Sequence, residues 1–356
     1  MAVNGEAIAA WVFGGQGYVA GELLRLLAYH PRFRVSRVFS TSQEGERVAA
    51  AFPHLAETLG DLTFAAQESF SEALEPGLGA ALFFATPHGA TAALVDRVLA
   101  RAEKVGAPVR AVDLSADFRL DDLAVYEATY GQPHGAPARL ADFVAGVPEL
   151  CSGRPPKHAA QPGCFTTAAT LAAHPFLALG ICEPEIFVAA VTGSSGSGRT
   201  PGAGTHHPER AHNLYAYNPL GHRHETEMRT YLARAAGRPV EVAFVPHSGP
   251  FVRGIHATVS LRLREPEAAA HLVERVNAFY GPRSFVQATT TAPKLTEVAG
   301  TNRARLGVFC RGKTLVVTAA IDNLVKGAAG GGVQWMNRLF DLDDDAGLRI
   351  PGVGLY

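Results

Sequence analysis

The segment Ile8–Glu22 reads IAAWVFGGQGYVAGE, an apolar run that stops at a glycine-rich turn. Ile8–Phe13 is typical of a buried parallel strand. After the turn, Leu23–Leu27 supplies the apolar face of a helix that ends near His30. A strand, a glycine turn and a helix in this order favour a dinucleotide-binding site, because small residues let a pyrophosphate approach the backbone at the helix N-terminus. The spacing is not G-x-G-x-x-G, so glycines that only permit a tight turn remain the alternative.

Three further strands are expected before residue 150, at Phe33–Phe39, Ala80–Ala85 and Val109–Val112. Polar turns follow the last two of these strands, Thr86–Gly89 and Asp113–Arg119. The carboxyl ends of parallel strands form the edge at which open α/β sheets bind ligands. Helix capping and ordinary loop polarity are the alternative explanation of these turns. The order predicts a doubly wound parallel sheet.

The end of the second expected strand, Ser40–Gln43, is where such folds bind the adenosine ribose. It contains no Asp or Glu to accept a bond from a free 2′-hydroxyl. Its hydroxyl groups suit a 2′-phosphate better, so NADP is favoured over NAD.

A candidate nucleophile lies in the stretch QPGCFTTA, residues 161–168. Cys164 follows a small-residue turn and begins a predicted helix. Unpaired N–H groups and the positive end of the helix dipole at this position favour thiolate over thiol. The same N–H groups suit an oxyanion formed by attack on a carbonyl. A buried cysteine that only fills space is the alternative.

The sequence pattern changes after Cys164. Ile186–Thr192 is an expected strand that opens into the Gly/Ser loop Gly193–Thr200, whose N–H groups, hydroxyls and arginine suit an anion. Histidines follow in His206–Arg210 and Gly221–Glu227. They lack a third ligand at metal-binding spacing, so acid/base and substrate-anchoring roles are favoured and no metal site is expected.

The remaining pattern predicts an α+β domain. Strands are expected at Val240–Val245, Gly254–Leu263 and Leu315–Ile321, and helices at Ala268–Phe279 and Gly331–Phe340. A mixed, largely antiparallel sheet with helices on one face suits this order. The predicted fold class is therefore α/β, with a Rossmann-type sheet followed by this second domain.

Composition narrows the classes of partner and location. With 32 Lys+Arg against 33 Asp+Glu, the formal net charge is −1, which argues against nucleic acid and anionic membranes as partners. Four cysteines without C-x-x-C spacing indicate reduced thiols. The N-terminus has neither the basic nor the apolar region of a signal peptide, and no apolar run reaches membrane-spanning length. We expect a soluble, cytoplasmic protein.

Seven stretches, in this order along the chain, carry a resemblance to a known family. They are Gly14–Glu22, Pro87–Gly89, Asp113–Arg119, Val147–Leu150, Pro162–Cys164, Gly221–His224 and Asp322–Gly330. Together they resemble the N-acetyl-gamma-glutamyl-phosphate reductases, in the aspartate-semialdehyde dehydrogenase-like group. The resemblance implies NADPH-dependent reduction of an acyl phosphate to a semialdehyde in arginine biosynthesis, through a thioester and with release of phosphate.

The resemblance also implies domains and site residues. A Rossmann domain spans residues 1–150, a catalytic and oligomerisation domain spans 151–325, and a C-terminal helix within 326–356 returns to the first domain. Cys164 is then the nucleophile and His222 its acid/base partner. The predicted substrate-binding residues are Arg119, Ser195, Gly196, Arg199, His224 and Glu227, the two arginines being chosen on charge and position. The predicted cofactor-binding residues are Gly14, Gln16, Gly17, Tyr18, Ser40, Thr86, Pro87, His88, Ser115, Asn323 and Lys326. A chain of this size is expected to form a homodimer or homotetramer.

Some positions depart from the family pattern. Phe165 and Thr166 stand where the family has Tyr and Pro, and Thr41 stands where it has Arg. The segment His206–Arg210 resembles a branch in which a small acidic carrier protein holds the substrate nitrogen, for lysine or ornithine synthesis. A carrier-linked aminoadipyl or glutamyl phosphate, another phosphorylating semialdehyde dehydrogenase, and a regulator that binds a dinucleotide without chemistry remain the alternatives.

Overall fold

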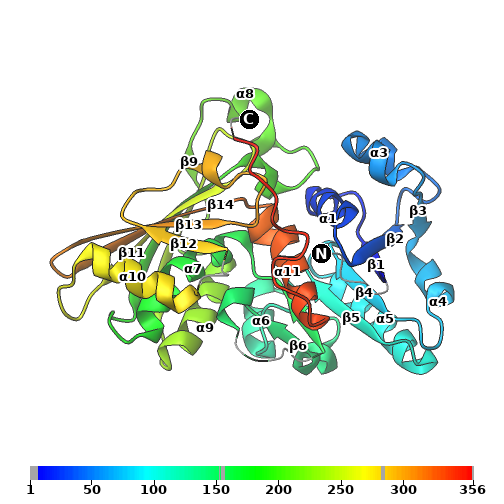
Figure 1. Cartoon of the computed structure of the whole chain (residues 1–356), viewed down its shortest axis with the longest axis horizontal. Helices are drawn as coiled ribbons and strands as arrows, with labels where there is room; N and C mark the ends of the chain where they lie inside the picture. The colour runs from blue at the N-terminus through cyan, green and yellow to red at the C-terminus, as the bar shows by residue number, and fades with distance from the viewer. Residues whose placement is uncertain (1–6, 152, 154–156, 282–284, 355–356) are drawn as a thin grey trace. The chain divides into compact units, whose positions relative to one another are not determined.

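The computed structural model describes residues 7–151, 153, 157–281 and 285–354 (Figure 1). The residues from which the absence of a signal peptide was predicted, 1–6, lie outside this part. The chain divides into two compact units: unit 1 is Met1–Gln161 with Ala329–Arg349, and unit 2 is Pro162–Ala328 with Ile350–Tyr356. The first boundary lies later than residue 150 because a further short strand joins the first sheet.

Unit 1 is built on a seven-stranded sheet in which every pair of neighbours is parallel. Its order is β3-β2-β1-β4-β5-β7-β6. The strands are β1 (Ile8–Phe13), β2 (Phe33–Ser40), β3 (Phe64–Ala66), β4 (Ala80–Phe84), β5 (Val109–Asp113), β6 (Phe143–Ala145) and β7 (His158–Ala160). The α-helices are α1 (Tyr18–Ala28), α2 (Val48–Ala51), α3 (Ala56–Leu59), α4 (Phe70–Ala73), α5 (Thr91–Val105), α6 (Leu123–Tyr130) and α11 (Gly330–Leu339). The predicted doubly wound sheet is confirmed.

Aromatic side chains on neighbouring strands form the centre of this unit. The Phe13 ring stacks on Phe39 of β2 at 4.4 Å and on Phe84 of β4 at 4.6 Å between centroids. Offset stacking of this kind adds to the free energy gained by burying the rings. The tight packing fixes the strand ends, from which the glycine turn and the polar turns extend.

The C-terminal helix α11 completes unit 1. Gly332 lies so close to Leu114 that an added Cβ would come within 2.7 Å of it. Trp335 is fully buried and donates from Nε1 to the Gly146 carbonyl at 2.9 Å, and Asn337 bonds to His30 at 3.0 Å. The small residue Gly332 thus allows α11 to pack closely on the rest of unit 1.

Unit 2 contains the second seven-stranded sheet, in the order β12-β13-β14-β11-β8-β10-β9. The strands are β8 (Glu185–Thr192), β9 (Tyr215–Ala216), β10 (Glu241–Ser248), β11 (Ile255–Arg262), β12 (Val286–Thr289), β13 (Ala304–Arg311) and β14 (Thr314–Ile321). The pairs β8–β10 and β12–β13 are parallel and the other neighbours are antiparallel. The α-helices are α7 (Cys164–Ala178), α8 (His207–Arg210), α9 (His224–Ala236) and α10 (Ala269–Tyr280). The predicted α/β fold with a mixed second sheet is confirmed.

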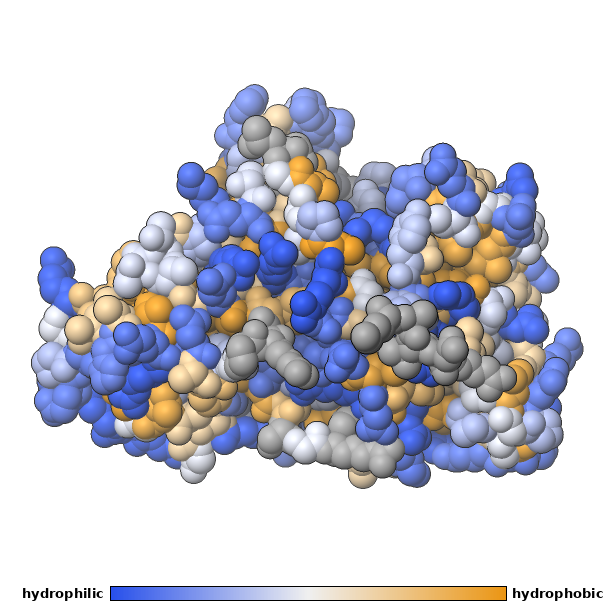
Figure 2. Space-filling model, viewed as in Figure 1, coloured by the Kyte–Doolittle hydropathy of each residue, from blue (hydrophilic) through white to orange (hydrophobic). Residues whose placement is uncertain are grey.

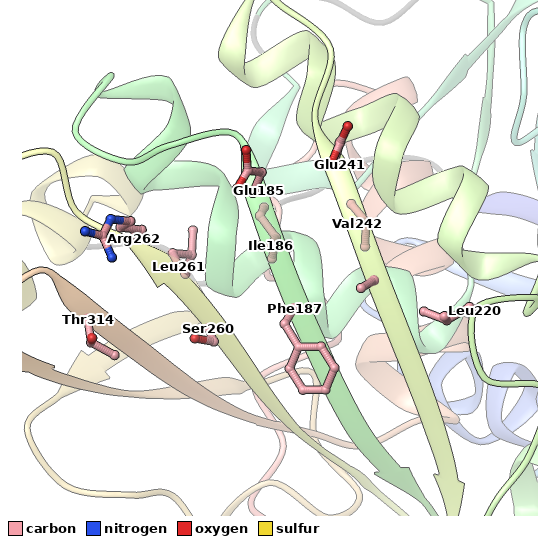
Figure 3. Close-up of a pocket in the computed structure, with 11 residues that line it drawn as sticks. Glu185, Ile186, Phe187, Leu220, Glu241, Val242, Ser260, Leu261, Arg262 and Thr314 are labelled. Carbon is pink, nitrogen blue, oxygen red and sulfur yellow. The ribbon is translucent and has the colours of Figure 1, made fainter.

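The two faces of this second sheet differ. Ile186, Val188 and Ala190 of β8 are buried on the face that α7 covers. The side chains between them point to the opposite face, where Phe187 is 48% exposed. A pocket of about 510 Å³ lies there across β8, β10, β11 and β14, and Figure 3 shows the Phe187 ring projecting from its strand into view. None of the lining residues belongs to α7, so this pocket lies apart from Cys164.

Figure 2 shows hydrophilic residues and apolar patches side by side over the face of the molecule in view. Among the described residues, no helix combines the length and the apolar character that crossing a membrane requires.

Candidate active site

Cys164 is the first residue of α7 and is partly exposed, whereas the helix behind it is almost wholly buried. Gly163 is the N-cap, in extended conformation, and as a glycine it has no side chain with which to cap the helix. The first N–H groups of a helix have no partners within the helix. The sulfur therefore lies at the positive end of a 15-residue helix, as the sequence predicted.

A buried carboxylate holds the turn before Cys164. Glu227 Oε2 accepts from the Gly163 N–H and from Thr166 Oγ1, each at 2.9 Å. Glu227 has no exposed surface. It was predicted to contact substrate, but its carboxylate lies beneath the turn and bonds the backbone next to Cys164. Thr166, where the family pattern has proline, supplies the second of these donors.

Close approaches fix Cys164 from two other sides. An added Cβ on Gly163 would lie 2.2 Å from His224 Nε2, so only glycine lets the His224 ring reach this point. An added Cβ on Gly327 would lie 2.6 Å from the Cβ of Cys164. His224 is 7% exposed, and its Nε2 is 4.0 Å from Glu227 Oε1. His224 therefore packs against the turn that carries the thiol.

His222 lies in the loop that leads into α9. Its Nδ1 accepts from the His224 N–H at 3.1 Å, which assigns the proton of the neutral ring to Nε2. Burial lowers the pKa of His222 to about 4, and the neighbouring Arg223 acts in the same direction. Phe165 and Tyr217 meet the ring edge-on, at 5.8 and 5.6 Å between centroids. His222 is therefore neutral near pH 7 and presents a donor at Nε2.

The Gly/Ser loop after β8 differs from its prediction. The N–H groups of Gly193, Ser194 and Ser195 donate to carbonyls of the segment 251–254, and those of Gly196 and Gly198 donate within the loop. The Ser195 hydroxyl donates to the Val252 carbonyl at 2.6 Å. These N–H groups hold the loop against the segment 251–254 and within itself, and anion binding by the loop stays a prediction. Arg199 is exposed at its end.

Asn323 and Lys326, predicted to hold cofactor, lie in the segment after β14. Asn323 Oδ1 accepts from the Gly254 N–H at 2.7 Å, and Nδ2 donates to Ser195 Oγ at 3.0 Å. Lys326 is fully buried, with Nζ 5.4 Å from the centre of the Phe285 ring. The structure thus assigns both side chains contacts within unit 2.

The glycine turn after β1 fits a dinucleotide phosphate. Gly14 has φ +87°, and an added Cβ would lie 2.5 Å from the Ala85 carbonyl oxygen, so glycine is required there. Gly17 is the N-cap of α1, it has no side chain with which to cap that helix, and an added Cβ there would meet nothing within 4 Å. Tyr18 is 41% exposed at the helix start. A helix N-terminus that begins at a glycine beside open space is suited to a pyrophosphate.

The turn after β2, where the adenosine ribose was predicted to bind, is held by hydrogen bonds. Ser40 is 5% exposed, and its Oγ accepts from the N–H groups of Ser42 and Gln43 at 3.3 and 3.2 Å. Gln16 Nε2 donates to Ser42 Oγ at 2.8 Å, which ties the glycine turn to this loop. Ser40 therefore shapes the turn, while Thr41 and Ser42 are exposed.

The turns after β4 and β5 form one network. Asp117 accepts from the N–H groups of Gly89 at 2.7 Å and Ala92 at 2.9 Å, so it caps α5 from the neighbouring turn. His88 Nδ1 accepts from the Ala116 N–H at 2.9 Å. Thr86 and Ser115, predicted to bind cofactor, are 9% and 1% exposed, whereas Pro87 and His88 are exposed.

Two more polar groups lie inside this network. Burial raises the pKa of Asp113 to about 6, and its carboxylate accepts from the N–H groups of Ser115 and Phe118 at 2.7 and 3.1 Å. Arg119 is 5% exposed and donates to the carbonyls of Gln161 at 2.8 Å and Leu114 at 3.2 Å. Its predicted contact with a substrate anion remains a prediction.

The structure brings Cys164, His222, His224 and Glu227 together in unit 2 and the glycine turn and polar turns together in unit 1. Sequence reasoning missed Arg210 and Tyr217. Arg210 is buried and Tyr217 borders His222, yet both lie in a segment that reads as an exposed polar loop. No cluster of metal-binding side chains occurs among the described residues.

Two family models match the chain. Residues 9–154 match the semialdehyde dehydrogenase NAD binding domain, and residues 164–323 match the semialdehyde dehydrogenase dimerisation domain. An N-acetyl-gamma-glutamyl-phosphate reductase of Pseudomonas entomophila is 39% identical over 97% of this chain and 99% of its own length. A protein of the same name from Symbiobacterium thermophilum is 40% identical over 97% of this chain and 98% of its own length.

Solved structures share the fold at lower identity. An aspartate semialdehyde dehydrogenase II of Vibrio cholerae superposes with a TM-score of 0.69 at 18% identity, covering 95% of this chain and 99% of that one. An aspartate semialdehyde dehydrogenase of Candida albicans with NADP gives 0.65 at 16% identity, covering 96% and 100%.

Proposed function

The chain belongs to the semialdehyde dehydrogenases, in the N-acetyl-gamma-glutamyl-phosphate reductase family, and on that premise we propose that it reduces N-acetyl-gamma-glutamyl phosphate to N-acetyl-glutamate semialdehyde. It is an oxidoreductase of amino-acid biosynthesis, in the arginine route, with NADPH as reductant and phosphate as the leaving group. The observation that carries the proposal is the partly exposed Cys164 at the start of α7, with the neutral His222 ring 5.8 Å from the ring of the adjacent Phe165.

The first half of the reaction forms a thioester. The Cys164 thiolate attacks the acyl carbon, a carbon–sulfur bond forms, and the carbon–oxygen bond to phosphate breaks. The tetrahedral oxyanion is stabilised by the N–H groups at the start of α7 and by the Nε2–H of His222. Because a neutral ring can only donate at Nε2, we propose hydrogen-bond donation as the main role of His222, in place of proton abstraction from the thiol.

The second half releases the aldehyde. When bound, NADPH supplies a hydride to the thioester carbon. His222 again donates to the oxygen as its charge develops, and collapse of the hemithioacetal breaks the carbon–sulfur bond and regenerates the Cys164 thiolate. The turn Gly14–Tyr18 and the exposed His88 are the residues that we propose hold the cofactor. Glu227 is proposed as a positioning residue for Cys164.

We propose that the chain is a dimer, in which the open face of the second sheet forms the interface. The matching dimerisation domain spans that sheet, and Phe187 projects from its open face. Phe187→Lys should shift the protein from dimer to monomer in analytical ultracentrifugation. An unchanged sedimentation coefficient would show that the interface does not lie at Phe187. A cytoplasmic location is part of the same proposal, since all four cysteines are free.

The test is the reverse reaction. The purified protein is mixed with phosphate, NADP and N-acetyl-glutamate semialdehyde, and NADPH absorbance is followed. We expect phosphate-dependent NADPH formation that Cys164→Ser abolishes and that Cys310→Ser, at another partly exposed thiol, retains. Full activity of Cys164→Ser would end the covalent mechanism.

A substrate panel tests the acyl group. The proposed substrate would be wrong if the protein did not turn over the acetylated compound but did turn over aspartate semialdehyde, or a semialdehyde linked to an acidic carrier protein. The small acetylated substrate is favoured because both relatives described above carry that name.

A further inference from the structure

A buried arginine lies at the ends of two strands of unit 2. Arg210, the last residue of α8, is 6% exposed. Its guanidinium donates to Ser248 Oγ at the end of β10 and, at 3.5 Å, to the Thr192 carbonyl at the end of β8. These contacts hold the planar group in one orientation.

The charge of Arg210 is not balanced within the described part of the chain. No carboxylate there forms an ion pair with it, although Arg253 nearby in the same unit pairs with Asp322 at 3.0 Å. The Arg210 Nε–H is buried and has no hydrogen-bond partner among the described residues. Buried charges are almost always paired, because an unpaired charge and an unmade hydrogen bond both cost free energy. The Arg210 guanidinium is therefore suited to bind an anionic group.

The place adjoins the candidate active site. The Tyr217 N–H donates to the Pro246 carbonyl of β10 at 3.0 Å, two residues before Ser248, which Arg210 contacts. The Tyr217 ring lies 5.6 Å from His222 between centroids. Thr192, which accepts from Arg210, directly precedes the loop of Ser195. A ligand whose acyl carbon lies at Cys164 thus has Arg210 within its surroundings.

We propose that Arg210 binds the α-carboxylate of the substrate, an inference that rests on the proposed function. A fixed guanidinium fork matches a planar carboxylate through two parallel hydrogen bonds. The carboxylate is present in substrate and product alike, which suits a rigid, buried partner. The exposed Arg199 suits the phosphate better, because phosphate must leave after the first half-reaction. In this proposal Arg210 binds the carboxylate, a role that charge and position had suggested for Arg119.

The reverse reaction separates the two anions, since phosphate and the semialdehyde are then different substrates. Arg210→Met should raise the KM for N-acetyl-glutamate semialdehyde about 10- to 100-fold and leave the KM for phosphate and the Kd for NADP nearly unchanged. Arg210→Lys should recover part of the loss, and Arg234→Met, at an exposed arginine of α9, should behave like the wild type. A rise in the phosphate KM with an unchanged semialdehyde KM would overturn the proposal.

A substrate without the carboxylate distinguishes binding from folding. The wild type should prefer N-acetyl-glutamate semialdehyde to 4-acetamidobutanal by about 10- to 100-fold, and Arg210→Met should reduce that preference to near one. A variant that lowers activity on both aldehydes equally, with the preference intact, would assign Arg210 a purely structural role and refute the inference. Thermal unfolding of each variant shows whether it is folded.

If the wild type turns over neither aldehyde, the proposed function is refuted but the inference about Arg210 is not. A binding assay then tests that inference. N-acetyl-L-glutamine should slow alkylation of Cys164 by iodoacetamide in the wild type, its α-amide should not, and Arg210→Met should abolish the difference. Equal protection by acid and amide in the wild type would overturn the carboxylate site.

Discussion

The helix that carries Cys164 contains a proline, and the structure replaces the hydrogen bond that the proline removes. Pro175 lies inside α7 and has no N–H to donate to the Leu171 carbonyl four residues earlier. Tyr280, the last residue of α10, donates from its hydroxyl to this carbonyl at 2.6 Å. Leu171 itself is fully buried. Tyr280→Phe therefore removes the replacement donor and should destabilise α7 by about 1–3 kcal/mol, the cost of a lost hydrogen bond with a buried partner left behind.

A double-mutant cycle isolates this bond. In Pro175→Ala the helix regains its own donor, so Tyr280→Phe should cost less than about 0.5 kcal/mol in that background. Because the chain has two units, amide hydrogen exchange of α7 measures the effect better than a global midpoint. Exchange should quicken about 5- to 100-fold in Tyr280→Phe alone, and Tyr29→Phe, at a tyrosine that is 78% exposed, should change nothing. An equal cost of Tyr280→Phe in both backgrounds would refute the reasoning.

Three further predictions concern Cys164 and pH. Gly327→Ala should abolish turnover, because its Cβ would lie 2.6 Å from that of Cys164, whereas Gly202→Ala, which meets nothing within 4 Å, should be tolerated; an active Gly327→Ala enzyme would contradict the close approach. Glu227→Gln should slow alkylation of Cys164 by iodoacetamide as the turn loosens, with about 2 kcal/mol lost in urea unfolding; lost stability with an unchanged alkylation rate would leave Glu227 without a positioning role. Desolvation lowers the pKa of four buried or half-buried histidines to about 4: His30, His158, His174 and His222. As pH falls, the unfolded chain protonates these histidines before the folded chain does, so the free energy of unfolding should decrease from about pH 6.5 towards pH 4. Asp113, whose pKa is raised in the folded protein, offsets the proton uptake of one histidine. A urea midpoint that stays constant over this range would be inconsistent with neutral histidine rings in the folded protein.

Much of the fold followed from the sequence because its periodicity was strong. The central strands of the first sheet are short, fully apolar and bounded by glycine or polar turns, which is the pattern of a buried parallel strand. The strand Ala304–Arg311 was not predicted. Its arginines and Gly307 lie on a partly exposed sheet, so its alternation is weak. The three-residue strands were missed because they are too short to show any period.

The position of the candidate nucleophile was predictable because it depends on one local feature. Cys164 was identified because a small-residue turn before a helix is visible in the sequence. The hydrogen bonds that hold the Gly/Ser loop could not be predicted, because composition does not tell whether N–H groups are free or bonded to the segment 251–254. Arg210 was overlooked for a related reason: the burial of an arginine depends on Thr192 and Ser248, which are distant in sequence. The features that could not be predicted depend on contacts between residues that are far apart in the sequence. Residue type alone does not reveal such contacts.

Helix α11 gives this chain an unusual order of assembly during synthesis. Unit 1 begins at the N-terminus, but the helix that buries Trp335 and meets His30 is translated only after nearly all of unit 2. At ribosomal rates of about 5–20 residues per second, the first sheet waits on the order of ten seconds or more with one side uncovered. During that interval the nascent sheet exposes the apolar surface that α11 later covers. Binding by chaperones that recognise exposed apolar segments is therefore expected at this stage, and slower elongation between residues 162 and 328 should lower the yield of folded protein.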